Sequence, residues 1–243
     1  MEYFRTLRDD DPVLAHSPLL RAAQLTLQYT VDQGAIPLTP SKAFKRVFVH
    51  WAAEHFDWPD MGYDELFSVN KVLNEYDFAP LELLHFLLIE LKLGRHYKGQ
   101  FKITKRGAEL LAHPQQLLME LVPYYMMNMD HSSYSRSGDQ AVGNWDVWLN
   151  VLNVETENGS TEIQLYEVFY GKLGNAPMAW RATSSFYCCV LRPLCWAGLL
   201  TAHQAQGDKR LEAAYFKTPL WPAWLTLDTD NMVEPAQRHW LLC

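Results

Sequence analysis

Two stretches of the sequence carry the same succession of local signals, and this order constrains the fold more than any other feature. In the first stretch a helical pattern over Tyr63–Leu73 is followed by the turn NEYDFAP and by the leucine-rich helical pattern LELLHFLLIELKLG. The next segment, RHYKGQFKIT, is typical of a hairpin with Lys98-Gly99 at its turn, and Lys105-Arg106-Gly107 opens a further helix. Helix, helix, two-stranded hairpin and helix is the order of a helix-turn-helix with an attached wing.

The second stretch, residues 162–217, repeats this order. It predicts a helix, a turn, a longer helix that Pro193 must kink or interrupt, and a hairpin: Glu162–Leu173, 174–177, Arg181–Leu200, and Leu199–His203 with Leu211–Lys217 around a Gly207-Asp208 tip. We therefore predict an α+β fold that is mainly α with short β-hairpins. The repeated order favours tandem winged-helix-like units that arose as a diverged repeat.

The remaining segments complete the predicted organisation. Residues 13–29 are expected to be helical with Ser17-Pro18 at the start, Ile36 and Leu38 to form a short strand, and Thr39 or Ser41 to cap a helix reaching Phe56. The polar residues 128–144 predict an exposed linker, before a short helix and a loop over 145–161. The predicted ranges are N-terminal helices packing on the first unit (1–60), the first winged-helix-like unit (61–127), linker and short helix (128–161), and the second unit (162–243).

Charge and cysteine usage limit the classes of partner. The net charge is −7, and residues 107–180 carry two basic and nine acidic side chains. Nucleic-acid binding depends on neutralising phosphates with Lys and Arg, so an acidic chain needs its cations to cluster. The beginning MEYFRTLRDDDP lacks the apolar segment of a signal peptide, LLHFLLIEL is too short to span a membrane, and the four cysteines are typical of reduced core residues. We expect a cytoplasmic protein that does not associate with a membrane.

The sequence offers little support for catalysis or metal binding. The nine histidines are scattered, and neither Cys-x-x-Cys nor His-Glu-x-x-His occurs. Asp130-His131-Ser132-Ser133 contains the side chains of a hydrolytic triad, but they are adjacent in a polar segment rather than held across a scaffold. We therefore expect a protein without enzymatic activity, cofactor, metal or small-molecule substrate.

DNA binding is one hypothesis that the predicted fold suggests. The second helix of the first unit offers only Glu82, His85, Glu90 and Lys92, without the Arg, Asn or Gln that read base edges. The first hairpin, in contrast, is rich in basic residues that could contact phosphates: Arg95, His96, Lys98, Lys102, Lys105 and Arg106. In the second unit the candidates are Arg181, Thr183, Ser184, Ser185 and Arg192, with Lys209 and Arg210 at the hairpin tip. An ordinary solvated hairpin remains the alternative interpretation of the first cluster.

Protein binding is the competing hypothesis. Interfaces favour Tyr, Trp, Met and Arg, and PYYMMNMDHSSYSR, WPDMGYDELF and PLWPAWL have that composition. Tyr124 and Tyr125 in the first of these segments are the candidate aromatic contacts. Other aromatic residues are expected in the core, together with Leu84, Leu87 and Leu91 at helical spacing.

Three segments also carry a family resemblance. IPLTPSKAFKRVFVHWAAE, NEYDFAPLELLHFLLIELKLGRHYKGQFKITKRGAELL and FYCCVLRPLCWAGLL resemble proteins related to the plasmid pRiA4b ORF-3 group, over about residues 36–216. The chain departs from that group at Ser41-Lys42-Ala43, where a glycine is usual. The resemblance implies a winged-helix-like region in a protein of plasmids and other mobile genetic elements. It also implies that such a protein could act as an inhibitor of host defence.

The favoured function is the non-enzymatic binding of a macromolecular partner, either a host protein or a ribonucleoprotein or other nucleoprotein complex. The alternative is a sequence-specific DNA-binding transcriptional regulator. The expected partner-binding residues are Arg95, Lys98, Lys102, Lys105, Arg106, Tyr124, Tyr125, Arg181, Lys209 and Arg210.

Overall fold

Each half of the chain forms its own small antiparallel sheet, and the two sheets have the same strand order. The first sheet has the order β1-β3-β2 and the second has the order β4-β6-β5. The strands are β1 Ile36–Pro37, β2 Gly94–Tyr97, β3 Gln100–Ile103, β4 Ser160–Thr161, β5 Leu200–His203 and β6 Ala214–Lys217. In both sheets a short strand from before the main helices pairs with the second strand of the hairpin.

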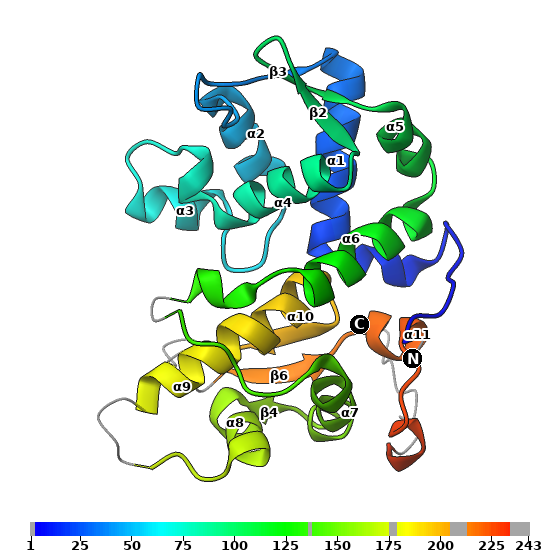
Figure 1. Cartoon of the computed structure of the whole chain (residues 1–243), viewed down its shortest axis with the longest axis vertical. Coiled ribbons are helices and arrows are strands. Elements are labelled where there is room, and N and C mark those ends of the chain that lie inside the picture. Colours follow the sequence, from blue (N-terminus) through cyan, green and yellow to red (C-terminus); the bar gives the residue numbers. More distant parts are fainter. Residues whose placement is uncertain (1–2, 136–137, 175–178, 205–212, 234–243) are drawn as a thin grey trace, which may run out of the picture. The chain divides into compact units, whose positions relative to one another are not determined.

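The computed structural model describes residues 3–135, 138–174, 179–204 and 213–233 (Figure 1). Its N-terminal unit comprises residues 6–129 and 196–199, and its C-terminal unit comprises residues 3–5, 130–195 and the described residues from 200 onward. These units differ from the predicted ranges, because β1 lies in the predicted N-terminal region 1–60 yet pairs with β3. Likewise β4 lies in the predicted linker region but pairs with β6. The mainly helical α+β class is confirmed.

Helices of the N-terminal unit flank its sheet and leave the tip of the β2–β3 hairpin uncovered (Figure 1). They are η1 Pro12–His16, α1 Pro18–Gln33, α2 Arg46–His55, α3 Tyr63–Val69, η2 Glu75–Asp77, α4 Ala79–Glu90, α5 Lys105–Leu111 and α6 Pro114–Asn128. The predicted start of α1 is confirmed, since the Ser17 hydroxyl accepts a hydrogen bond from the Leu20 amide at 3.2 Å. Helix α1 packs against α4, α6 and β3 and so forms the centre of this unit.

The β2–β3 hairpin turns where the sequence predicts. Lys98 and Gly99 have φ angles of 49° and 71°, as required at both central residues of a two-residue turn whose twist matches that of the strands. The first residue of β2, Gly94, must be a glycine because a Cβ atom there would lie only 2.0 Å from the ring of Phe101. Phe101 is therefore held tightly between the hairpin and the core, where it is fully buried.

The C-terminal unit contains its own set of helices: η3 His131–Tyr134, α7 Trp145–Glu155, α8 Glu162–Tyr170, α9 Ala179–Phe186, the π-helical turn η4 Tyr187–Leu191, α10 Arg192–Ala197, α11 Leu220–Trp224 and η6 Asp230–Met232. The last two residues of α10 belong to the N-terminal unit. The predicted interruption at Pro193 takes the form of η4. Because proline has no N–H, the helix widens in the turn before it. The predicted Gly207-Asp208 tip lies outside the described residues.

Several predicted helix limits are wrong. Helix α2 begins at Arg46 rather than near Thr39 or Ser41, because Phe44 is held in an extended conformation by a bridge to Leu38. Helix α3 ends at Val69, where the Asn70 side chain caps the Leu66 carbonyl at 2.9 Å. The leucine-rich helix α4 ends at Glu90, and Lys92 turns the chain into β2 with a φ of 59°. The helix predicted from Lys105 is interrupted at residues 112–113 and restarts as α6 at Pro114.

The predicted exposed linker is also partly wrong. His131, Ser132 and Ser135 are buried, in and next to η3. Asp130 begins η3, since its carboxylate accepts hydrogen bonds from the amide and the hydroxyl of Ser132 at 3.0 and 2.6 Å. These two bonds lower the pKa of Asp130. The string Asp130-His131-Ser132 is therefore a local capping structure.

The leucines of α4 show where the core of the N-terminal unit lies. Leu84 and Leu87 are fully buried, as predicted, whereas Leu91 is half-buried at the end of the helix. None of the helices in the described ranges has the length and apolar character needed to cross a membrane.

Candidate functional site

The N-terminal hairpin, defined as β2–β3, has two chemically different faces. The strands pair Arg95 with Lys102, His96 with Phe101, and Tyr97 with Gln100. Because side chains alternate between the faces of a strand, Arg95, Tyr97 and Lys102 share one face while His96 and Phe101 share the other. Phe101 is buried in the core, so the face with Arg95 is the outer one.

Three cations surround one tyrosine on this outer face. The distances to the centroid of the Tyr97 ring are 5.6 Å from Arg95 Cζ, 5.3 Å from Lys98 Nζ and 6.0 Å from Lys102 Nζ. The ring itself belongs to a residue that is 47% exposed. Exposed cation–π contacts are worth about 0.5–1 kcal/mol each and leave the charges intact. We name Arg95, Tyr97, Lys98 and Lys102 the basic hairpin face.

The charges of the basic hairpin face have no acidic partner within the described ranges, where no ion pair involves Arg95, Lys98 or Lys102. Arg95 and Lys102 also stand directly opposite each other across the ladder. Like charges in that position destabilise a sheet, by an amount of the same order as the roughly 0.2–1 kcal/mol that favourable pairs contribute. Among the described interactions only the contacts with the Tyr97 ring offset this repulsion, and an unfavourable pair of this kind is typical of functional surfaces.

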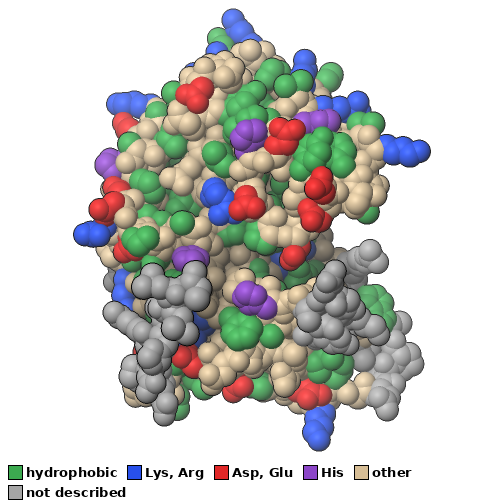
Figure 2. All heavy atoms as spheres, turned by 180° about the vertical axis from the view of Figure 1, so that it is seen from behind, with side chains coloured by type: hydrophobic (Ala, Val, Ile, Leu, Met, Phe, Trp, Pro, Cys, Tyr) green, Lys and Arg blue, Asp and Glu red, His purple; other side chains and the backbone are tan. Residues whose placement is uncertain are grey.

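The other predicted cations differ from this set. Lys105 is almost fully exposed and lies 3.7 Å from Glu109 one helical turn away. Arg106 donates to the Leu91 carbonyl at 2.7 Å and pairs with Glu120 at 2.7 Å. Both therefore have partners within the N-terminal unit. Figure 2 shows Lys and Arg side chains projecting from the upper part, where the N-terminal unit lies, with acidic side chains interspersed among them.

Arg181 in the C-terminal unit is held by an acidic residue as well. Its guanidinium donates two hydrogen bonds to the two carboxylate oxygens of Asp139, at 2.9 and 3.0 Å. Thr183 and Ser185, on the same helix, are buried. Lys209 and Arg210 lie outside the described residues.

The two predicted aromatic contacts, Tyr124 and Tyr125, differ in how far they are buried. Tyr125 is 1% exposed, so the expectation that it lies on a partner surface is wrong: α6 turns this side chain into the core of the N-terminal unit. Tyr124 is half-buried. Loss of water and the nearby Glu90 carboxylate raise the pKa of the Tyr124 hydroxyl.

The inner face of the hairpin ends in a chain of titratable groups that the sequence did not indicate, with an exposed member, His96, and two buried ones. His96 Nε2 lies 2.8 Å from His85 Nε2, and His85 Nδ1 lies 2.5 Å from Glu75 Oε1. The second oxygen of Glu75 accepts a hydrogen bond from the Phe44 amide, and the Phe44 ring stacks on His85 with centroids 3.8 Å apart. His85 and Glu75 are both buried.

The contacts of this His96–His85–Glu75 chain hold the hairpin in position and do not form a metal site. The Glu75 carboxylate accepts the Nδ1 proton of His85, so that with neutral rings His96 donates to His85 Nε2. Loss of water around the ring, together with the charges of His85 and Lys42, lowers the pKa of His96. In the described part of the chain no group of three or more His, Cys, Asp or Glu side chains could hold a metal ion.

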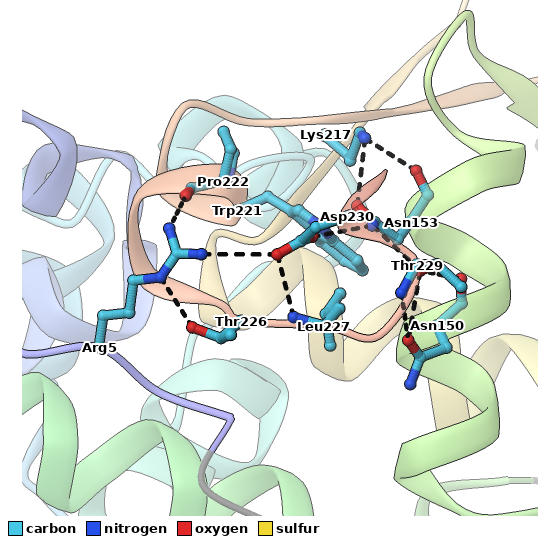
Figure 3. A network of polar contacts seen from close by, with 10 residues as sticks. All are labelled: Arg5, Asn150, Asn153, Lys217, Trp221, Pro222, Thr226, Leu227, Thr229 and Asp230. Carbon is cyan, nitrogen blue, oxygen red and sulfur yellow. Dashed lines mark hydrogen bonds and ion pairs between the residues drawn. The ribbon is translucent and has the colours of Figure 1, made fainter. Parts of the chain in front are cut away.

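The C-terminal unit uses its polar residues differently (Figure 3). Asn153 on α7 is buried and accepts a hydrogen bond from Trp221 Nε1 at 2.9 Å. Its amide nitrogen lies 3.1 Å from both Thr229 Oγ1 and Asp230 Oδ1. Lys217, the cation at the end of β6, donates to the Asn153 carbonyl at 2.8 Å and pairs with Glu157. Lys217 therefore stabilises the unit and is not available to a partner.

The N-terminal segment of the chain completes this network. Arg5 donates to Thr226 Oγ1 at 2.7 Å and to the Pro222 carbonyl at 3.0 Å, and it lies 3.5 Å from Asp230 (Figure 3). The Arg5 amide also donates to the Trp224 carbonyl at 2.7 Å. Because each of these contacts joins segments more than 200 residues apart, sequence patterns gave no sign of them.

The described residues form a mainly helical protein with two units of equivalent sheet topology, and within them the cations of the basic hairpin face pair with no carboxylate. Residues 15–116 match the Y4jL N-terminal domain, and residues 135–219 match the Y4jL C-terminal domain. A protein of Sinorhizobium fredii (strain NBRC 101917 / NGR234), named uncharacterized protein y4jL, is 40% identical over 168 residues, which are 68% of this chain and 75% of the relative. The chain belongs to the Y4jL family. No solved structure matches it significantly.

Proposed function

We propose that this protein binds a macromolecular partner without catalysing a reaction, and that the partner is a protein assembly that contains nucleic acid. The observation that carries this proposal is the basic hairpin face. Three cations surround an exposed aromatic ring there, and none is paired within the described residues. Lys and Arg neutralise phosphates, and an aromatic ring offers a stacking surface for a base.

We also propose that both units are winged helices. Each unit has the order helix, strand, helix, helix, strand, strand, with α3 as an added short helix in the N-terminal unit and with α9 continuing through η4 in the C-terminal unit. In each the first strand pairs with the last, so the hairpin extends from the sheet as a wing. The hairpin of the N-terminal unit is then the wing that contacts phosphates.

The helices in the position that would read bases lack the side chains for it, which favours contact with phosphates over recognition of a sequence. The exposed side chains of α4 are Glu82, Phe86 and Glu90, which place acidic and apolar groups where a base-reading helix needs donors. In the C-terminal unit Arg181 is held by Asp139, and Thr183 is buried. A sequence-specific DNA-binding regulator is therefore the weaker alternative.

The net charge favours nucleic acid that is presented within a protein assembly. A chain with a charge of −7 repels free duplex over most of its surface, so three wing cations give weak affinity by themselves. A nucleoprotein adds protein contacts to those phosphate contacts. Exposed apolar side chains such as Phe86 and Tyr76 provide surface for them.

A capture experiment from host extract tests the proposal. Tagged full-length chain is compared with the variant Arg95→Ala/Lys98→Ala/Lys102→Ala, with and without nuclease. A matched control, Arg8→Ala/Lys71→Ala/Lys172→Ala, changes three exposed cations elsewhere and so has the same net charge as the hairpin variant. We expect the native chain and the control to capture a complex of protein and nucleic acid, and nuclease or the hairpin variant to reduce capture several-fold. Equal capture by all three chains with nuclease present would overturn the proposal.

A further inference from the structure

A hollow opens beside the His96–His85–Glu75 chain in the N-terminal unit. It has a volume of about 540 Å³ and lies between the loop that leads into α2 and the segment Asn74–Tyr76. Its lining is mostly apolar and includes Phe44, Val47 and Tyr76. Val47 is 78% exposed and Tyr76 is 68% exposed, so two large apolar side chains stand in water at its edges.

The rim of this hollow is positively charged. Lys45 and Arg46 line it and are exposed, and neither forms an ion pair within the described residues. Arg46 Nε donates to Asn74 Oδ1 at 2.9 Å, which links the two walls of the hollow. The nearby carboxylates are already engaged: Glu75 binds His85 and the Phe44 amide, while Asp77 accepts from the amide and side chain of Asn74.

We infer that this hollow binds an acidic peptide segment of the partner protein that carries a bulky apolar side chain. Arg46 and Lys45 would pair with the carboxylates of that segment, because a guanidinium binds a carboxylate with two parallel hydrogen bonds. The apolar side chain would enter the hollow between Val47 and Tyr76, which are buried on binding. Buried anchors of this kind, surrounded by polar contacts, supply most of the energy of protein interfaces.

The composition of the walls distinguishes a peptide from a nucleic acid. A nucleic-acid strand would satisfy Lys45 and Arg46 with phosphates, but a base that filled the hollow of about 540 Å³ would bury its polar edges against mostly apolar walls, which is costly without hydrogen-bond partners. The position also fits the proposed function, on which this inference rests. The Leu38 amide donates to the Gly99 carbonyl at 2.9 Å, so the loop that lines the hollow is joined to the tip of the basic hairpin face.

Peptide selection on the full-length chain tests the inference. Random 12-residue peptides displayed on phage are selected at about 150 mM salt, and enriched peptides are titrated by fluorescence anisotropy. Two variants alter the hollow, Arg46→Ala and Val47→Asp. Their matched controls are Lys71→Ala and Val69→Asp, which change an exposed cation and an 81% exposed valine elsewhere in the N-terminal unit. Thermal melts check that each variant folds.

We expect enriched peptides to combine Asp or Glu with an aromatic or leucine side chain. Each hollow variant should weaken their binding about tenfold or more, the scale of one lost charge-assisted contact or anchor, while the controls stay within about twofold. No enrichment, peptides without acidic residues, equal binding by the hollow variants, or displacement by a 12-nucleotide single strand would each overturn the inference. Changing Arg95, Lys98 and Lys102 to Ala should leave peptide affinity unchanged. A negative result for peptide binding in the hollow can therefore be distinguished from a negative result for phosphate binding by the basic hairpin face.

Discussion

The two hairpins occupy the same place in the same topology, but their surfaces have different chemistry. Phe101 in β3 and Tyr215 in β6 are equivalent in the register and both are buried, so each anchors its hairpin to a core. One position further along, the N-terminal hairpin pairs Arg95 with Lys102, whereas the C-terminal hairpin (β5–β6) pairs Thr201 with Phe216. The repeated fold therefore requires the aromatic anchor and does not require the cations.

The cations of the two hairpins also differ in what they contact. Lys217 at the end of β6 is enclosed by Asn153 and Glu157 and stabilises its own unit. Arg95, Lys98 and Lys102 contact only the ring of Tyr97 among the described interactions. Charges that pair with no carboxylate among the described residues, two of them directly opposite each other, support the proposed binding of a partner.

The largest effect is expected where the C-terminal unit depends on its buried polar network. Asn153→Ala leaves the buried Trp221 indole N–H without its acceptor and removes the amide contacts with Thr229 and Asp230, which should lower the free energy of unfolding by about 1–3 kcal/mol. Lys217 keeps the backbone carbonyl of residue 153 and Glu157 as partners. Urea unfolding followed by tryptophan fluorescence measures the loss. The matched variant Asn158→Ala, at an exposed position of the same unit, should cost clearly less. Equal losses in both variants would show that the network does not stabilise the unit as described.

A smaller change should result from giving the N-terminal hairpin the residues of its counterpart. Arg95→Thr with Lys102→Phe replaces a like-charge pair by the pair found in the C-terminal hairpin. The repulsion that it relieves and the two cation–π contacts that it removes are each of the order of 0.5–1 kcal/mol and oppose each other, so the free energy of unfolding should change by less than about 1 kcal/mol. The same variant should lose affinity for polyanions. Unfolding midpoints and polyanion titrations on one preparation would check both effects, and a large loss of stability would show that the fold itself requires these cations.

The smallest change should come from pH. The pKa of His96 is lowered in the folded protein from its ordinary value near 6.5, so the unfolded chain binds the proton more readily. This contribution to stability is present above about pH 6.5 and is lost as the pH falls from there through the lowered pKa. His96→Gln should flatten the stability curve in that window. Parallel curves for His96→Gln and the native chain would exclude this role.

Local features could be predicted from the sequence. The turn at Lys98-Gly99, the Ser17 cap of α1 and the interruption before Pro193 each depend on residues within one or two turns of chain, whose backbone preferences are strong. The short strand predicted over Ile36 and Leu38 is confirmed as β1 Ile36–Pro37, whereas β4 and the strand partner of each were not predicted. A two-residue strand has no periodicity, and its pairing with a hairpin strand more than 50 residues away depends on the tertiary fold.

The candidate site could be predicted only in part. The basic cluster is visible because Arg95, Lys98 and Lys102 are close in sequence, but their separation from Arg106 depends on where Glu120 lies in the fold. The pairing of Arg181 with Asp139 spans 42 residues and crosses a segment that looked like a linker. His85 stood out as a polar residue in a leucine-rich helix, yet its partners His96 and Glu75 come from a strand and a short turn.

The salt dependence of polyanion binding shows whether the basic hairpin face contacts phosphates. A labelled random-sequence duplex is titrated with the native chain, the Arg95→Ala/Lys98→Ala/Lys102→Ala variant and the charge-matched control between about 50 and 200 mM salt. We expect dissociation constants of about 10⁻⁴–10⁻⁶ M for the native chain near 150 mM salt, without sequence preference. The logarithmic salt slope should fall by up to about 0.9 for each hairpin cation removed and stay unchanged in the control. Equal slopes in all three chains, or nanomolar binding to a selected sequence, would contradict this expectation.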